Sequence, residues 1–121
     1  AQHLRRRGEE LLLKACQVET ERGLSAVESI VQTDGVDMVF FAPVELAASA
    51  ARGREAGLLT ALELAESTVK QAGKLLGGML LPGRSLQQMF LAGYDIVCTT
   101  SDVILMRTSA ENSLQEAKPP A

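Results

Sequence analysis

The chain has few of the residues that stack on nucleic acid bases or build disulfide frameworks. Among its 121 residues there is no Trp, aromatic residues make up 3%, and there are only two Cys and one His. Proteins that bind nucleic acid use basic surfaces and aromatic platforms, whereas the net charge here is −3, so nucleic acid is not an expected partner. The short basic run Arg5-Arg6-Arg7 is interpreted as the solvated face of an N-terminal helix.

The sequence also lacks long apolar runs. None reaches the roughly 20 residues of a membrane span, and no signal peptide is visible at the N-terminus. Cys16 and Cys98 lie far apart in apolar runs, without a second Cys or His at metal-ligand spacing. We therefore expect buried, reduced thiols and a cytoplasmic protein that does not associate with membranes. His3, the single histidine, is expected to be an exposed terminal residue.

Short apolar runs alternate with helical patterns along the chain. The predicted strands cover residues 11–18, 38–41, 75–81 and 96–98. Helices are predicted from 25 to about 33, over 55–72, from 85 to 93 and from about 103, with a looser segment after 43. Two of the helices begin with a capping-box pattern, in which Ser25 is followed by Glu28 and Ser85 by Gln88.

Four successive βα units with strands apolar on both faces indicate a parallel sheet covered by helices. Right-handed crossovers leave two arrangements open, a small doubly wound sheet or part of a (β/α)₈ barrel. The pattern of apolar residues does not choose between them. A doubly wound nucleotide-binding domain would be expected to carry a G-x-G-x-x-G or P-loop sequence, and this chain has neither.

Polar side chains follow the first two predicted strands. Gln17 and Glu19 stand at the end of the first strand, and Glu45 comes just after the second. Because the carboxyl ends of parallel strands meet at one edge, these two carboxylates could converge on a hard cation such as Mg²⁺ or Mn²⁺. The alternative is that both are ordinary surface carboxylates. Asp37 precedes its strand and is expected at the opposite, stabilising edge, while Asp34 and Asp102 are expected in turns or caps.

Two runs of residues resemble motifs of the HpcH/HpaI aldolase family. Residues 17–20, Gln-Val-Glu-Thr, are similar to the family's Gln-Ile-Glu-Thr or Gln-Ile-Glu-Ser. Residues 35–47, Gly-Val-Asp-Met-Val-Phe-Phe-Ala-Pro-Val-Glu-Leu-Ala, are similar to its Gly-Val-Asp-Gly-Val-Phe-Ile-Gly-Pro-Ala-Asp-Leu-Ala. Residues 78–82 and 93–102 look like the next barrel strand and the last one. The resemblance implies an α/β fold, the C-terminal half of a (β/α)₈ TIM barrel, as one partial domain over 1–121 with a frayed tail at 115–121.

For function, the resemblance implies a class II pyruvate aldolase, a metal-dependent lyase. Such an enzyme cleaves a 2-keto-3-deoxy or 4-hydroxy-2-keto acid to pyruvate and an aldehyde. Glu19 and Glu45 would be the metal ligands, for Mg²⁺, Mn²⁺ or Co²⁺, and the metal would act as a Lewis acid on the keto acid. The residues implied in substrate binding are Gln17, Ala42, Pro43, Val44 and Leu80.

The chain departs from the family pattern in three ways. Glu45 replaces Asp, Ala42 replaces Gly, and the family's catalytic Arg and His belong to the absent first half of the barrel, so no catalytic residue is expected here. The resemblance also implies a homo-oligomer. Two alternatives stay open, a non-catalytic half-barrel or assembly fragment, and an enzyme similar to citrate lyase β-chain or malyl-CoA lyase.

Overall fold

The computed structural model describes residues 12–50, 55–81 and 83–117. Four parallel strands form one sheet in the order β1-β2-β3-β4. Each strand therefore lies beside the one that precedes it in the chain, and each crossover moves one place in the same direction. A doubly wound sheet reverses direction at a switch point, whereas a barrel does not. The fold is the α/β half-barrel. Its strands are β1 (Ala15–Val18), β2 (Met38–Phe41), β3 (Leu75–Met79) and β4 (Ile96–Cys98).

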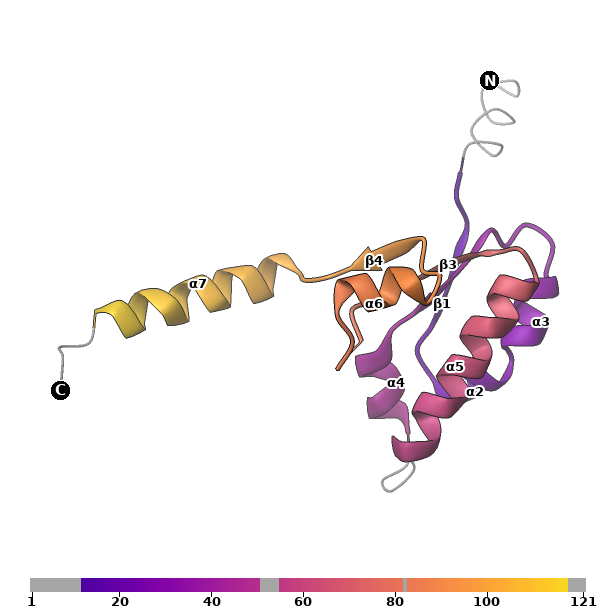
Figure 1. Cartoon of the computed structure of the whole chain (residues 1–121), viewed down its shortest axis with the longest axis horizontal. Coiled ribbons are helices and arrows are strands. Elements are labelled where there is room, and N and C mark those ends of the chain that lie inside the picture. The colour runs from indigo at the N-terminus through magenta and orange to yellow at the C-terminus, as the bar shows by residue number, and fades with distance from the viewer. Residues whose placement is uncertain (1–11, 51–54, 82, 118–121) are drawn as a thin grey trace.

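Helices occupy the connections between the strands, and α7 extends away from the sheet after β4 (Figure 1). The predicted helix over 55–72 and the predicted strands at 38–41 and 96–98 are confirmed. The helices are α2 (Glu21–Ser25), α3 (Val27–Gln32), α4 (Pro43–Ser49), α5 (Glu55–Gln71), α6 (Leu86–Leu91) and α7 (Asp102–Glu116).

The hydrophobic core lies between the sheet and the helices. Alternate strand residues point to opposite faces, and those packed with the helices are Val18, Val39, Phe41 and Leu76. We call this face the helix side and the opposite face the inner face. Residues of the inner face alternate with them and are aligned across the sheet by its register, for example Gln17 with Phe40, Gly77 and Ile96.

Two aspartates tie the strands together at the amino edge of the sheet. The Asp37 carboxylate accepts a hydrogen bond of 2.8 Å from the Lys14 backbone N–H, and Asp95 accepts one of the same length from Leu76. Each aspartate lies two residues after a glycine with positive φ in the turn that follows a helix. The φ values are 79° at Gly35 and 96° at Gly93. The prediction that Asp37 lies at the stabilising edge is confirmed.

The carboxylate of Glu66, only 4% exposed, is the one buried charge among the described residues of the core. Arg84 Nη1 donates to its two oxygens at 3.0 and 3.3 Å, and the Tyr94 hydroxyl donates at 2.7 Å. A second acid, Glu63, lies 3.4 Å from Arg84 Nη2. Burial, together with the hydrogen bond to Glu66, raises the pKa of Tyr94. No local sequence pattern marks this network, because Glu63 and Glu66 on α5 lie 18 to 31 residues from Arg84 and Tyr94.

Three local predictions are wrong. Ser25 does not cap a helix, because α2 already begins at Glu21 with Thr20 as its N-cap, and the Ser25 hydroxyl donates to the Glu21 carbonyl instead. The looser segment predicted after 43 contains α4, which starts with Pro43 at its first position, where proline costs no hydrogen bond. Cys98 is exposed rather than buried, and Cys16 is half-buried.

Other boundaries shift by a few residues. The first strand begins at Ala15 rather than 11, the third ends at Met79, and α7 continues through 115–116, where the frayed tail was predicted to begin. The capping box at Ser85 and Gln88 is present as predicted, and Asp102 Oδ1 accepts from the next backbone N–H within the first turn of α7. His3, the basic run at 5–7 and residues 118–121 lie outside the described residues.

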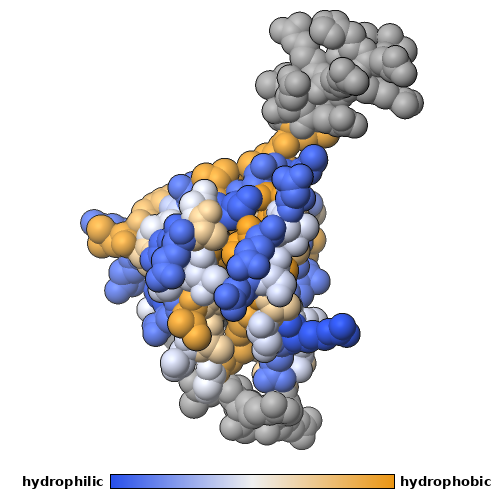
Figure 2. Space-filling view, turned by 90° about the vertical axis from the view of Figure 1, so that its right-hand side faces the viewer, coloured by the Kyte–Doolittle hydropathy of each residue, from blue (hydrophilic) through white to orange (hydrophobic). Residues whose placement is uncertain are grey.

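The last two helices carry an unusual amount of exposed apolar surface. On α6, Leu91 is 80% exposed, and along the described length of α7 no residue is buried. Figure 2 shows the side of the molecule opposite to α7, where polar and apolar side chains are interspersed. Among the described residues, no helix combines the length and apolar character needed to cross a membrane.

Candidate metal and substrate site

The two predicted metal ligands lie at the carboxyl edge of neighbouring strands. β1 pairs with β2 so that Val18 stands opposite Phe41, the last residue of each strand. Glu19 comes directly after this pair, and Glu45 lies in the first turn of α4. Both side chains are exposed. The structure therefore places both carboxylates at one edge, on loops that are neighbours in the sheet.

Two hydrogen bonds hold these loops together on either side of the carboxylates. The Ala42 N–H donates to the Val18 carbonyl at 3.1 Å, one residue before Glu19. The Glu21 N–H donates to the Ser49 hydroxyl oxygen at 3.2 Å, and that hydroxyl donates to the Leu46 carbonyl at 2.8 Å. The segment with Glu19 is thus fastened to both ends of the segment with Glu45. Sequence reasoning missed Ser49, because nothing local marks a serine at the end of an unpredicted helix.

The side chains at this edge offer oxygen donors, two carboxylates and the amide of Gln17, which suit a hard divalent cation. No group of three or more His, Cys, Asp or Glu capable of holding a metal occurs in the part of the chain that the structure describes. Magnesium is commonly held by one or two carboxylates, with water or substrate in the remaining positions. The donors present fit that mode of binding, and they do not fit a metal enclosed by protein ligands.

The residues predicted to bind substrate divide into two groups. Gln17 lies exposed on the inner face, and Val44 is 67% exposed in the first turn of α4. Ala42 is 1% exposed, and its φ of −113° is one that any residue adopts, so its methyl group is packed inside the protein. The substitution of the family's glycine therefore neither strains the backbone nor projects the methyl into solvent at the edge.

Leu80 and Pro43 lie on the helix side of the sheet. Leu80 packs against the core on the helix side, and only its backbone N–H, which donates to the Cys98 carbonyl at 2.8 Å, faces along the sheet. By alternation, the inner-face residues at this height are Met79 and Cys98. The ring of Pro43 lines a separate pocket on the helix side. Direct contact of these two side chains with substrate stays a prediction.

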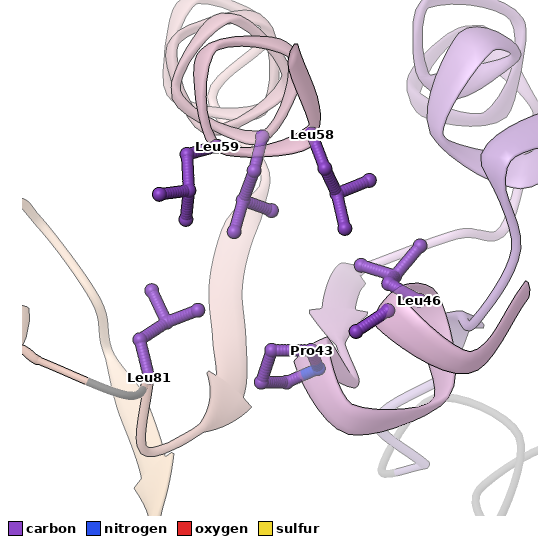
Figure 3. A pocket seen from close by; sticks show the side chains of 7 residues that line it. Pro43, Leu46, Leu58, Leu59 and Leu81 are labelled. Atoms are coloured by element: carbon purple, nitrogen blue, oxygen red, sulfur yellow. The ribbon is translucent and has the colours of Figure 1, made fainter. Parts of the chain in front are cut away.

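That separate pocket has a volume of about 240 Å³ and lies between α4, α5 and the end of β3 (Figure 3). Every side chain that lines it is apolar. Its described lining therefore offers no charged or hydrogen-bonding side chain to a keto acid. The lining residues are Pro43, Leu46, Ala47, Leu58, Leu59, Leu62 and Leu81.

The sequence matches the HpcH/HpaI aldolase/citrate lyase family over residues 2–108. It is 32% identical over 105 residues to a hydroxypyruvate/pyruvate aldolase of Paraburkholderia phytofirmans, covering 84% of this chain and 40% of that protein. It is also 32% identical over 99 residues to a 4-hydroxy-2-oxo-heptane-1,7-dioate aldolase of Klebsiella pneumoniae, covering 78% of this chain and 37% of that protein.

The fold is similar to a crystal structure of a HpcH/HpaI aldolase/citrate lyase family protein from Burkholderia cenocepacia. The two align with a TM-score of 0.72 and 32% identity, over 87% of this chain and 42% of that one. The chain thus spans less than half the length of these relatives. The family match, the identity and the half-barrel agree, and the chain belongs to the HpcH/HpaI aldolase/citrate lyase family.

Proposed function

We propose that this chain supplies the metal-binding half of a class II pyruvate aldolase. The observation that carries the proposal is the position of Glu19 and Glu45 on two neighbouring loops held together by hydrogen bonds at Ala42 and Ser49. The substrate would be a 2-keto-3-deoxy or 4-hydroxy-2-keto acid, in which the bond between C3 and C4 breaks to give pyruvate and an aldehyde. The aldolases among its relatives support this reaction class.

Each residue at the edge has a role that follows from its chemistry. Glu19 and Glu45 would hold a divalent ion, Mg²⁺ or Mn²⁺ with Co²⁺ as a third candidate, which when bound supplies Lewis acidity to the keto oxygen. The Gln17 amide can donate to a substrate oxygen. The first backbone N–H groups of a helix have no partner within the helix. Those of Val44 and Glu45 would therefore donate hydrogen bonds to the substrate carboxylate.

We also propose a homo-oligomer in the cytoplasm. The apolar residues of α7 are exposed along its whole described length, and a 15-residue helix without packing is only marginally stable in water. A second copy is the partner that would cover them. The two cysteines are free, and Cys98 is exposed, which suits a reducing compartment.

The test measures pyruvate release from a 4-hydroxy-2-keto acid with Mg²⁺, Mn²⁺ and Co²⁺, and Mn²⁺ binding by calorimetry. Replacing Glu19 or Glu45 by Gln is expected to abolish Mn²⁺ binding and, where activity is present, to reduce it at least about 100-fold. Glu45→Asp restores the family's residue and is expected to bind Mn²⁺ at least as tightly as wild type. Glu28→Gln, an exposed carboxylate on α3, is the matched control. Mn²⁺ affinity that is equal in wild type and both Gln variants would contradict the metal site.

One observation favours a second candidate, a non-catalytic assembly module. β1 and β4 are the outer strands of the described sheet, and unpaired strand edges bind other chains. Size-exclusion mass distinguishes the candidates when it is combined with thermal melting in the presence of metal. A ligand that binds the folded state raises the melting temperature. A stable dimer whose melting temperature does not change with divalent ions would therefore favour the assembly module.

A further inference from the structure

The inner face of the sheet is built in layers, one below the other. Glu19 and Ala42 belong to the uppermost layer, at the carboxyl edge. The register aligns the next layer across all four strands, two residues earlier on each strand and therefore about 6.6 Å further along the strand from the edge. This second layer consists of Gln17, Phe40, Gly77 and Ile96.

Phe40 fills the centre of the second layer because its neighbour has no side chain. A Cβ atom at Gly77 would lie 2.8 Å from Cδ2 of Phe40 and 3.0 Å from the sulfur of Met38. Gly77 is not among the glycines with positive φ, so the glycine is required for space and not for backbone conformation. The Phe40 ring therefore lies across β3.

Burial shows that this packing belongs to the inner face. Met38 is 6% exposed, yet it is not part of the helix-side core, so it is buried within the inner face below Phe40. Phe40 is half-buried, which leaves part of its ring accessible. All four aromatic residues of the chain lie in the described segments, and the other three, Phe41, Phe90 and Tyr94, lie on the helix side or on α6.

We propose that Phe40 is a specificity-determining residue, the floor that limits the size of the 2-keto acid bound at the carboxyl edge. This inference rests on the proposed function, since it needs a keto acid held by Glu19 and Glu45. Pyruvate has a methyl group at C3 and fits above the ring. An additional carbon at C3, as in 2-oxobutanoate, has to enter the layer that the ring occupies.

The test compares binding of pyruvate and 2-oxobutanoate by calorimetry with Mn²⁺ present, and exchange of the C3 protons in D₂O by NMR. Wild type is expected to prefer pyruvate, and Phe40→Ala to reduce the ratio of the two Kd values by about tenfold or more, the value of one methylene in a fitted pocket. Phe40→Leu, which keeps more apolar volume, should reduce it less. Phe41→Leu, on the helix side, is the matched control and should leave the ratio unchanged.

Gly77→Ala tests the same floor from the neighbouring strand, because the added methyl would lie 2.8 Å from Cδ2 of the Phe40 ring and must displace it. It is expected to weaken pyruvate binding as well. If wild type binds neither keto acid with Mn²⁺, the proposed function fails. If wild type binds pyruvate but folded Phe40→Ala and Phe40→Leu both keep the wild-type ratio of the two Kd values, Phe40 does not limit the size of the substrate. The proposed function then stands. Circular dichroism establishes that each variant is folded.

Discussion

Tyr94 and Glu66 are joined by a 2.7 Å hydrogen bond, in which the phenol donates to a carboxylate buried in the core. Tyr94 follows the end of α6, and Arg84, which donates to the same carboxylate at 3.0 Å, precedes its start. One carboxylate on α5 therefore fastens both ends of α6. In this way a buried charge links α5 to the residues that precede and follow α6.

Replacing Glu66 by Gln should destabilise the protein by about 2 kcal/mol. Breaking a fully buried ion pair costs about 3–5 kcal/mol, but Arg84 is 23% exposed and keeps Glu63 within 3.4 Å, which reduces the loss. Urea unfolding measures it. The control is Glu111→Gln, which removes an exposed pair with Arg107 and should cost less than about 0.5 kcal/mol. An equal loss of unfolding free energy in the two variants would show that the buried pair stabilises the fold no more than the exposed pair.

The Tyr94 phenol should ionise at a higher pH in the folded protein than in the unfolded chain. Its folded pKa is raised by burial and by Glu66, so the protonated phenol stabilises the fold below the unfolded pKa, about 10. That stability is lost as pH rises above this value. Because Tyr94 is the only tyrosine and there is no Trp, tyrosinate absorbance reports on it alone.

We expect folded wild type to show no tyrosinate at pH values where the urea-unfolded chain is already ionised. Tyr94→Phe should remove the corresponding fall in unfolding free energy at alkaline pH. Coincident titration curves for the folded and unfolded chains would contradict the buried hydrogen bond.

The same substitution, glycine to alanine, should have opposite effects at two positions. A Cβ at Gly78 would lie 2.9 Å from Tyr94 Cε1 and 3.0 Å from the Phe41 carbonyl oxygen, so Gly78→Ala should cost about 1–3 kcal/mol. A Cβ at Gly57 in α5 meets no described atom within 4 Å, so Gly57→Ala should stabilise by about 0.5–1 kcal/mol. Thermal melting measures both effects, and an unchanged melting temperature of Gly78→Ala would contradict the close packing of β3 against Tyr94.

Two serines with the same sequence pattern should differ in their effect on stability. Ser85 accepts from the Gln88 N–H as a helix cap, so Ser85→Ala should cost about 1 kcal/mol. Ser25 only donates to the Glu21 carbonyl, and Ser25→Ala should stay within about 0.5 kcal/mol of wild type. Chemical denaturation of both variants measures the difference. A larger loss at Ser25 would mean that the capping box predicted there forms in solution.

Local sequence information was sufficient where neighbouring residues decide the structure. The helical pattern over 55–72 predicted α5, and the apolar runs at 38–41 and 96–98 predicted β2 and β4. Glycines with positive φ at 35, 73 and 93 lie in the turns that follow α3, α5 and α6. The resemblance to the aldolase motifs added the family, which the half-barrel and the comparisons confirm.

Only the tertiary structure decided which residues far apart in the chain meet. Helix α4 follows a pattern too short and too rich in alanine to stand out, and it is held by contacts of Leu46 and Ser49 with other segments. The order of the strands, the fastening of the Glu19 and Glu45 loops and the Glu66–Tyr94 pair all join distant residues. Their stability comes from burial and hydrogen bonding in the assembled fold, which no local pattern records.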